Sequence, residues 1–276
     1  MNKTFIKAIG KSINAISYIR PPYAAKLAIT LFATPRKGKL TQTESAFLQT
    51  AKQSNITHNN ITIKTYQWHA NDSYDTILLV HGWESNTYRW KALIAILQTK
   101  PYNIVALDAP AHGGSGSKTF NAVLYSECIN KVAKQFNTTH IIGHSIGGTA
   151  SALAVNQYSL PIKKLILLGA PSNFNAIIAS YIKTLGYNNR VSKAMDKYYY
   201  KTFGRLPDFY TIENFSENIN AKGLIIHDKK DRIISFKDAL TINKYYKNST
   251  LIKTEGFGHG LKSEKVYSHI IAFLAE

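Results

Sequence analysis

The sequence predicts an α/β fold in which helices cover both faces of an open, mostly parallel sheet. Short apolar segments alternate with helical ones along most of the 276 residues, and such repeated alternation produces a doubly wound sheet. The apolar segments are rich in Ile, Leu and Val, as parallel strands buried on both faces are. A third observation is the run Gly143-His144-Ser145-Ile146-Gly147, which fits G-x-S-x-G between an apolar and a helical segment.

The individual elements follow from apolar periodicity and from proline and glycine stops. Three helices are expected before the sheet, over Met1 to Ser17, Ala24 to Phe32 and Thr43 to Gln53. The expected strands are Ile61 to Trp68, Ile77 to Val80, Ile104 to Leu107, His140 to Ile142, Leu165 to Leu168, Leu224 to Ile226 and Leu251 to Thr254. The expected crossover helices are Tyr88 to Gln98, Asn121 to Phe136, Ile146 to Tyr158, Phe236 to Tyr246 and Lys262 to Leu274.

One long segment, residues 172–220, interrupts this alternation and is rich in Tyr and Phe. Structureless loops of that length are uncommon in compact domains. We therefore expect a small helical cap over the C-terminal edge of the sheet, where open α/β sheets bind ligands. The sequence thus divides into an N-terminal helical extension, residues 1–55, and an α/β domain, residues 56–276, which contains the cap.

The composition bounds the partners and cofactors. Lys and Arg number 34 against 16 Asp and Glu, a net charge of +18, which is basic enough to raise nucleic acid or anionic membranes as partners. The lysines are scattered, however, with no basic helix or zinc-finger spacing, so no nucleic-acid partner is expected. The single cysteine, Cys128, allows no internal disulfide and no multi-cysteine zinc site. One unpaired cysteine fits a cytoplasmic protein. We expect Cys128 to be a buried apolar residue.

The N-terminal segment has an amphipathic pattern. Phe5, Ile6, Ile9, Ile13 and Ile16 recur at helical spacing with lysines opposite. No segment reaches the roughly 18 apolar residues of a membrane-spanning helix, and no cleaved secretory leader is expected. Two hypotheses stay open: residues 1–20 lie on an anionic membrane, placing the protein at the inner membrane face, or they pack on the protein's own apolar surface.

Two later loops complete a constellation with Ser145. A serine hydroxyl needs a base to accept its proton, and that base needs an acid to orient it. His259 lies between glycines after the last expected strand, and Asp231 follows the strand before it. Both loops leave C-terminal strand ends, on the edge that carries Ser145. We therefore predict Ser145 as nucleophile, His259 as base and Asp231 as acid, with Asp228 as the rival acid.

Attack on an acyl carbon also requires two backbone N–H donors for the oxyanion. The residue after the nucleophile, Ile146, is one expected donor. The other is expected from the loop His81-Gly82-Trp83, where Gly82 permits a sharp turn so that Trp83 presents its N–H. Gly82 itself is the weaker alternative.

From Ile61 to the C-terminus the chain resembles the α/β-hydrolase fold serine hydrolases. Besides the serine motif, it carries Asp108-Ala109-Pro110-Ala111-His112-Gly113-Gly114-Ser115, similar to the family's D-x-P-G-H-G-x-S loop with Ala111 in place of a glycine. The resemblance implies that Asp108 and His112 are structural. It also implies that no metal or organic cofactor is needed.

The resulting hypothesis is a carboxylic ester hydrolase acting on a small-molecule ester through an acyl-enzyme. Alternatives are a membrane-associated lysophospholipase or monoacylglycerol lipase, a thioesterase, lactone hydrolysis, acyl transfer and cofactor-free peroxidation, because one machinery serves all of them. A non-enzyme alternative is a ligand-binding protein that retains the fold. The sequence leaves substrate identity and oligomeric state open.

Overall fold

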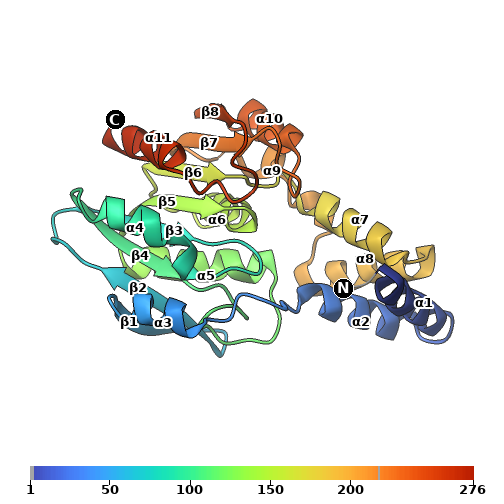
Figure 1. Ribbon diagram of the computed structural model, residues 1–276. Coiled ribbons are helices and arrows are strands. Elements are labelled where there is room, and N and C mark those ends of the chain that lie inside the picture. Colours follow the sequence, from blue (N-terminus) through green and yellow to red (C-terminus); the bar gives the residue numbers. More distant parts are fainter. Residues whose placement is uncertain (1–2, 217) are drawn as a thin grey trace.

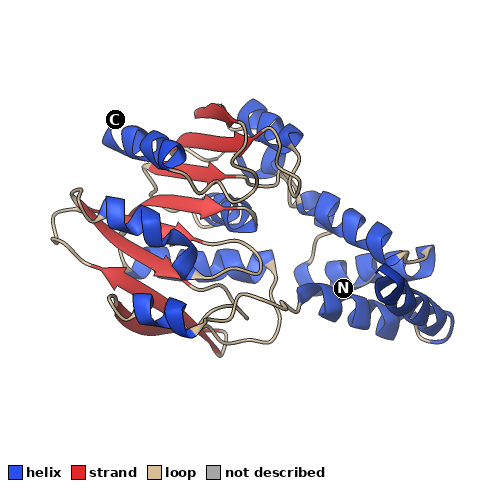
Figure 2. Ribbon diagram, viewed as in Figure 1, coloured by secondary structure: helices blue, strands red, loops and turns tan. Residues whose placement is uncertain are grey.

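The computed structural model describes residues 3–216 and 218–276, which form an α/β domain with a bundle of helices beside it (Figure 1). Strands run through the middle of the α/β domain, and helices lie on both sides of them (Figure 2). The bundle lies to the right in Figure 1, beyond the edge of the sheet where β5 and β6 end. We call this bundle the helical module and define it as residues 3–33 and 174–203.

Eight strands form one sheet in the order β1-β2-β4-β3-β5-β6-β7-β8. β1 pairs with β2, and β2 with β4, in antiparallel fashion, whereas every later neighbour in the sheet is parallel. This arrangement confirms the predicted doubly wound, mostly parallel sheet. The strands are β1 (Lys52–His58), β2 (Ile61–Trp68), β3 (Asp75–Val80), β4 (Tyr102–Leu107), β5 (Thr138–His144), β6 (Lys164–Leu168), β7 (Lys222–Asp228) and β8 (Ser249–Thr254).

Helices bury the two faces of the sheet in two separate cores. One core joins the sheet to α5, α6, α9 and α10, and the other joins it to α3, α4 and α11. The strand residues are apolar on both faces because neither face meets water. These helices are α3 (Gln42–Leu48), α4 (Lys91–Leu97), α5 (Ala122–Gln135), α6 (Ile146–Gln157), α9 (Ile212–Ser216), α10 (Phe236–Tyr245) and α11 (Glu264–Ala275), with short 3-10 turns η1 (Thr87–Trp90) and η2 (Pro207–Phe209).

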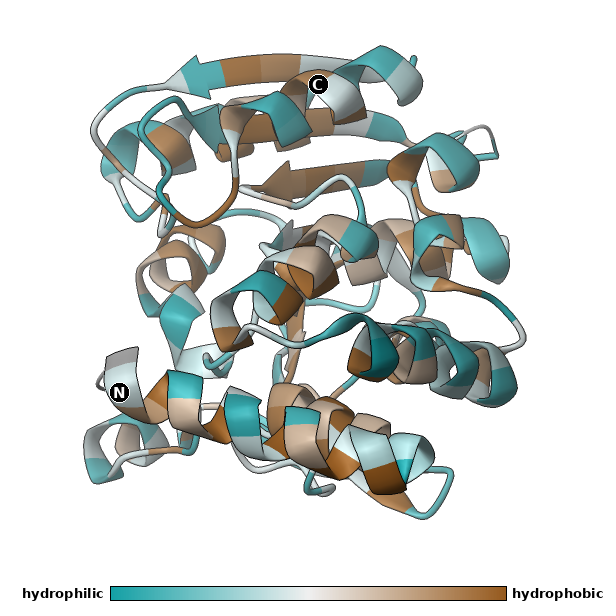
Figure 3. Cartoon of the chain, turned by 90° about the vertical axis from the view of Figure 1, so that its right-hand side faces the viewer, coloured by the Kyte–Doolittle hydropathy of each residue, from teal (hydrophilic) through white to brown (hydrophobic). Residues whose placement is uncertain are grey.

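The helical module has a third core of its own. It consists of α1 (Lys3–Ile19), α2 (Pro21–Ala33), α7 (Phe174–Leu185) and α8 (Asn189–Phe203). Ala24, Ala25 and Ala28 of α2 are fully buried, and small side chains such as these let helix backbones approach closely. Two helices of the predicted cap, α7 and α8, thus pack as one unit with two helices of the predicted extension, α1 and α2, and Figure 3 shows this unit end-on with α1 across the front.

Two predicted boundaries differ from the structure. The predicted extension reached residue 55 and its third helix Gln53, but α3 ends at Leu48 and β1 already begins at Lys52. β1 buries only Ile56, because it is an edge strand, so its sequence lacks the apolar alternation that signals a strand. Residues 1–2 of the first predicted helix and residue 217 of the cap lie outside the described residues. None of the helices described is long and apolar enough to cross a membrane.

Candidate active site

Ser145 lies on a sharp turn between β5 and α6. Its backbone has φ 54° and ψ −132°, a strained conformation for a residue with a side chain. Such a turn lifts a serine hydroxyl above the strand ends of this type of sheet. The side chain remains 8% exposed. The local geometry is therefore that of a nucleophile elbow.

The two glycines of the motif are required by close backbone contacts. A Cβ atom on Gly143 would lie 2.5 Å from the Cα of Gly148, and one on Gly147 would lie 2.3 Å from the carbonyl oxygen of His81. Backbone atoms cannot yield as a flexible side chain can. Side chains at these two positions would thus crowd the turn on both sides of Ser145.

The three predicted residues, far apart in the sequence, meet in one line of hydrogen bonds. The Nε2 of His259 lies 3.0 Å from the Oγ of Ser145, and its Nδ1 lies 2.7 Å from the Oδ2 of Asp231. Because an ionised carboxylate only accepts, Nδ1 carries the proton and donates it to Asp231. The Nε2 of the neutral ring is then the acceptor that faces the serine hydroxyl.

Asp231 is held in its ionised form. Its side chain is fully buried, and this burial raises its pKa, but hydrogen bonds from His227, His259 and the N–H groups of Ile233 and Ile234 outweigh burial and hold the pKa well below the usual range. The Nε2 of His227 lies 3.4 Å from Oδ2 of Asp231 and 3.1 Å from the carbonyl oxygen of Ile234. The carboxylate is thus charged and fixed in position.

Asp228, the rival acid, has a different position. It accepts hydrogen bonds from the N–H groups of Lys230 and Phe257 and from the hydroxyl of Thr254. Burial raises its pKa, but these bonds outweigh it and lower the pKa below its usual value. Asp228 therefore links the end of β7 to the loop that carries His259, without touching the histidine ring.

Two further side chains hold the His259 loop, and the sequence reasoning did not identify them. The Nε2–H of His144 donates to the carbonyl oxygen of His259 at 2.8 Å, and the guanidinium of Arg89 donates to that of Gly260 at 2.9 Å. His144 is buried, which lowers its pKa well below the usual value. The position of His144 beside the nucleophile was a usable signal, whereas nothing near Arg89 in the sequence pointed to this loop.

Of the two predicted oxyanion donors, Ile146 directly follows Ser145, and Trp83 directly follows Gly82, which lies against Ser145. Ile146 is the first residue of α6, and the first N–H groups of a helix have no acceptor within it. Gly82 lies so close that a Cβ atom there would be 2.9 Å from the Cβ of Ser145. Trp83 follows directly, and its ring packs against His112 and Phe120.

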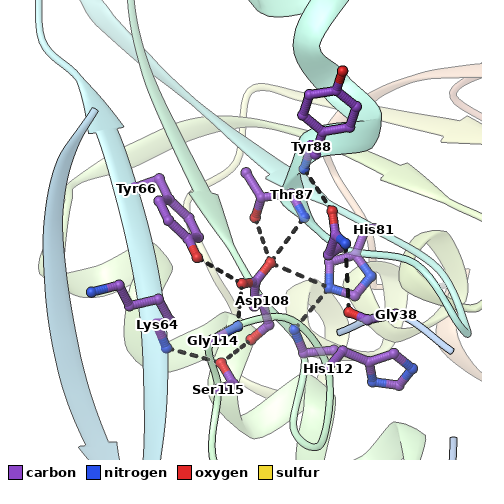
Figure 4. Close-up of polar contacts among 12 residues, drawn as sticks. Gly38, Lys64, Tyr66, His81, Thr87, Tyr88, Asp108, His112, Gly114 and Ser115 are labelled. Carbon is purple, nitrogen blue, oxygen red and sulfur yellow. Dashed lines mark hydrogen bonds and ion pairs between the residues drawn. The ribbon is translucent and has the colours of Figure 1, made fainter. Parts of the chain in front are cut away.

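Asp108 is the centre of a buried hydrogen-bond network around the loop that follows β4 (Figure 4). Its carboxylate accepts from the hydroxyl of Tyr66, from both the N–H and the hydroxyl of Thr87, and from the N–H of Gly114. Burial raises the pKa of Asp108. The network ties β2, η1 and the loop after β4 together.

His112 and Ala111 belong to the same loop. The Nδ1–H of His112 donates to the carbonyl oxygen of Pro110, and its Nε2 accepts from the N–H of Glu84. Ala111 has φ 68°, so the residue that replaces the usual glycine takes a left-handed conformation. His112 therefore joins the loop after β4 to the loop that contains Trp83.

The structure contains little that could hold a metal. Over residues 3–216 and 218–276, no group of three or more His, Cys, Asp or Glu side chains is arranged to bind one. Cys128 is free and buried in α5, where burial raises the pKa of its thiol to about 12.

Known proteins share both the sequence pattern and the fold. Residues 75–206 match the model of the alpha/beta hydrolase fold family. A serine hydrolase-like protein of Dictyostelium discoideum is 32% identical over 115 residues, which cover 39% of this chain and 32% of that protein. An uncharacterized hydrolase of Bacillus subtilis is 30% identical over 108 residues, which cover 37% of this chain and 39% of that hydrolase. The chain thus spans about a third of the length of each relative.

Solved structures extend the likeness over most of the chain. A putative lipase from Acinetobacter baumannii has a TM-score of 0.64 and 20% identity, covering 85% of this chain and 94% of the lipase. At this identity the likeness concerns the fold alone. Sheet order, family match and solved structures agree that the chain has the α/β-hydrolase fold.

Proposed function

We propose that the protein is a serine hydrolase that cleaves carboxylic esters through an acyl-enzyme intermediate. The observation that carries this proposal is the hydrogen-bonded line from Ser145 through His259 to Asp231, with the serine on a strained turn. The name of the Dictyostelium discoideum relative, serine hydrolase-like, supports a serine nucleophile.

The chemistry follows from this line of residues. The Oγ of Ser145 attacks the ester carbonyl carbon while the Nε2 of His259 takes the hydroxyl proton, and Asp231 stabilises the resulting imidazolium. The N–H groups of Ile146 and Trp83 stabilise the negative oxygen of the tetrahedral intermediate, at about 2.7–4 kcal/mol for each donor. His259 then returns its proton to the leaving alcohol, which leaves Ser145 acylated.

Water completes the cycle. His259 accepts a proton from a water molecule, the resulting hydroxide attacks the acyl carbon, and Ser145 leaves with a proton from His259. The products are the carboxylic acid and the free enzyme. Every step uses side chains and backbone donors of the chain itself.

Hydrolysis of p-nitrophenyl esters by the wild type and by Ser145→Ala tests the proposal. We expect turnover to fall by at least about 10⁴-fold in the variant, because among the described residues Ser145 is the nucleophile hydrogen-bonded to the Nε2 of His259. Ser268→Ala is the matched control, since Ser268 is exposed on α11 and bonds only to the carbonyl oxygen of Glu264. Turnover retained in folded Ser145→Ala would refute the proposal.

Lipid esters form a second candidate substrate class, as for a lysophospholipase or a monoacylglycerol lipase. The observation that favours it is the helical module, which exposes Phe5, Tyr18 and Ile19 beside basic residues. A p-nitrophenyl series from short to long acyl chains separates the two classes. A maximum at short chains supports a soluble-ester hydrolase, and a maximum at long chains supports lipid esters.

Two further measurements test whether the protein is a thioesterase or a ligand-binding protein. Acyl thioesters cleaved faster than the matching oxygen esters would make the protein a thioesterase. A fluorophosphonate probe labels a serine only when its hydroxyl is activated. Absence of labelling at Ser145 in folded protein would favour a ligand-binding protein that retains the fold.

A further inference from the structure

The net charge of the protein is concentrated in the helical module. Residues 3–33 and 174–203 contain ten Lys and Arg residues and one acidic residue, Asp196. These residues make up about a fifth of the chain, yet they carry +9 of the net charge of +18. The first acidic residue of the whole chain is Glu44. The module is therefore a strongly cationic body attached to a domain of much lower charge density.

The predicted apolar face of α1 is not available to a partner. Ile6, Ile9, Ile13 and Ile16 pack into the module core against α2, α7 and α8. The membrane hypothesis for residues 1–20 rested on this face, which the structure buries inside the protein. Any contact with a membrane must therefore use other side chains of the same segment.

Other apolar side chains are exposed on the module, and one of them, Phe5, belongs to the face predicted for α1. Tyr18 is 67% exposed, Ile19 84% and Tyr23 53%, all at the turn between α1 and α2, and Phe5 near the other end of α1 is 57% exposed. Ile19 is the most exposed large apolar side chain among the described residues.

Basic side chains border these apolar ones. Arg20 is exposed in the turn itself, and the guanidinium of Arg190 lies 4.9 Å from the ring centre of Tyr18. Lys7 and Lys11 are exposed along α1, which crosses the front of the module in Figure 3 with hydrophilic and hydrophobic bands interspersed.

The turn is held in place by polar contacts with the opposite helix pair. The side-chain amide of Asn14 donates to the carbonyl oxygen of Gly186, and its Oδ1 accepts from the N–H of Asn188. The α1–α2 turn and the α7–α8 turn thus lie together at the same end of the module. The exposed apolar side chains are presented by a fixed scaffold.

We propose that this outer surface of the module, comprising Lys7, Lys11, Tyr18, Ile19, Arg20 and Tyr23, binds the surface of an anionic lipid bilayer. Exposed apolar and tyrosine side chains insert at the level of the head groups, while Lys and Arg attract anionic lipids. Nucleic acid also attracts cations, but an aliphatic side chain such as Ile19 contributes nothing to binding a phosphate backbone. This inference does not depend on the proposed hydrolase activity.

Vesicle sedimentation of the full chain tests the inference, with phosphatidylcholine vesicles that contain or lack phosphatidylserine. We expect binding only to the anionic vesicles and weaker binding as NaCl increases. The charge variant Lys7→Glu/Lys11→Glu and the apolar variant Ile19→Ser/Tyr23→Ser should each reduce the affinity by about tenfold or more.

The α/β domain offers matched controls. Lys247→Glu changes an exposed lysine there, and Leu240→Ser changes an apolar residue that is 46% exposed. Both should leave vesicle affinity within about twofold of wild type. Tryptophan-monitored melting checks the fold of the α/β domain, which contains all three tryptophans, and hydrogen exchange in α1, α2, α7 and α8 checks that the module stays folded in its variants.

Three outcomes would overturn the inference. The first is no sedimentation with anionic vesicles, and the second is equal loss of binding in module and control variants. The third is binding to a single-stranded RNA oligonucleotide that depends on Lys7 and Lys11 while vesicles are not bound, which would assign the surface to nucleic acid.

Discussion

The α/β domain and the helical module differ in the residues from which they are built. All nine histidines and all three tryptophans lie in the α/β domain, and none lies in residues 3–33 or 174–203. The module carries half of the net charge and buries mainly Ala, Ile, Tyr and Met. All histidines are thus confined to one part, while the other part combines a simple packed core with a cationic surface.

The two parts also differ in backbone strain. Outside glycine, positive φ values occur at Glu84, Ala111, Ser145 and Leu261, among others, in loops of the α/β domain. In residues 3–33 and 174–203 the one residue with positive φ is a glycine, Gly186. Strained residues persist only where surrounding contacts determine their conformation, and they cluster at functional sites. The difference indicates that contacts in the α/β domain, unlike those in the module, hold residues with side chains in strained loop conformations.

The largest expected effect is the destabilisation of the module by a cavity in its core. Met195 is fully buried in α8, and Met195→Ala should destabilise the module by about 2–5 kcal/mol. Because the module has its own core, we expect hydrogen exchange to increase in α1, α2, α7 and α8, with little change in tryptophan-monitored unfolding of the α/β domain.

Leu78→Ala is the matched change in the other part, since Leu78 is fully buried in β3. It should lower the tryptophan-monitored stability and leave exchange in the module nearly unchanged. If either variant destabilises both parts equally, the two form one cooperative unit and the comparison fails.

Acid pH should destabilise the α/β domain selectively. Burial lowers the pKa of His140 from 6.5 to about 4, and it also lowers the pKa values of His81, His112 and His144. Below pH 6.5 these histidines bind protons in the unfolded chain but stay neutral in the folded protein. The free energy of unfolding that they contribute is therefore fully present above pH 6.5 and decreases as the pH falls toward their folded pKa values. For His140 alone this amounts to roughly 3 kcal/mol between pH 6.5 and pH 4.

Urea unfolding monitored by tryptophan fluorescence at a series of pH values measures this loss. His140→Asn should make the dependence on pH shallower, whatever its effect on stability at neutral pH. The module has no histidine, so exchange in its helices, corrected for intrinsic rates, should stay constant over the same range. Equal acid sensitivity in both parts would mean that the histidines of the α/β domain do not cause the loss of stability.

The sequence predicted the α/β domain and its site more fully than the module. Parallel strands bring their C-terminal ends to one edge, so Ser145, Asp231 and His259 could be assigned to one place from the strand ends alone. Asp228 and Asp231 lie only three residues apart at the end of β7. Only the observed hydrogen bonds distinguish their positions, since Asp231 binds the ring of His259 and Asp228 accepts from the N–H of Phe257.

The module could not be predicted as a unit for a physical reason. The apolar faces of α1 and α2 fit many partners equally well, and their partners α7 and α8 lie about 150 residues later in the chain. Periodicity within one helix contains no information on which distant helix covers it. The sequence therefore left open whether residues 1–20 meet a membrane or the protein itself.

Ala111 provides the smallest effect and a direct test of strain near the site. Its φ is 68°, its side chain is 3% exposed, and its N–H donates to the carbonyl oxygen of Gly116 at 2.7 Å. A left-handed conformation costs an L-residue about 1–2 kcal/mol, and a buried methyl group contributes about 0.8 kcal/mol. Ala111→Gly should therefore raise the free energy of unfolding of the α/β domain by less than about 1 kcal/mol.

The matched change in the module, Gly186→Ala, should have the opposite sign. Gly186 ends α7 with φ 67°, and a Cβ atom there would meet nothing within 4 Å, so the cost of about 1 kcal/mol comes from the backbone alone. Tryptophan-monitored urea unfolding measures the first variant, and hydrogen exchange in α7 and α8 measures the second. A decrease in stability for Ala111→Gly would mean that the methyl contacts exceed the strain, and that the loop beside Trp83 is held by ordinary packing, as the module is.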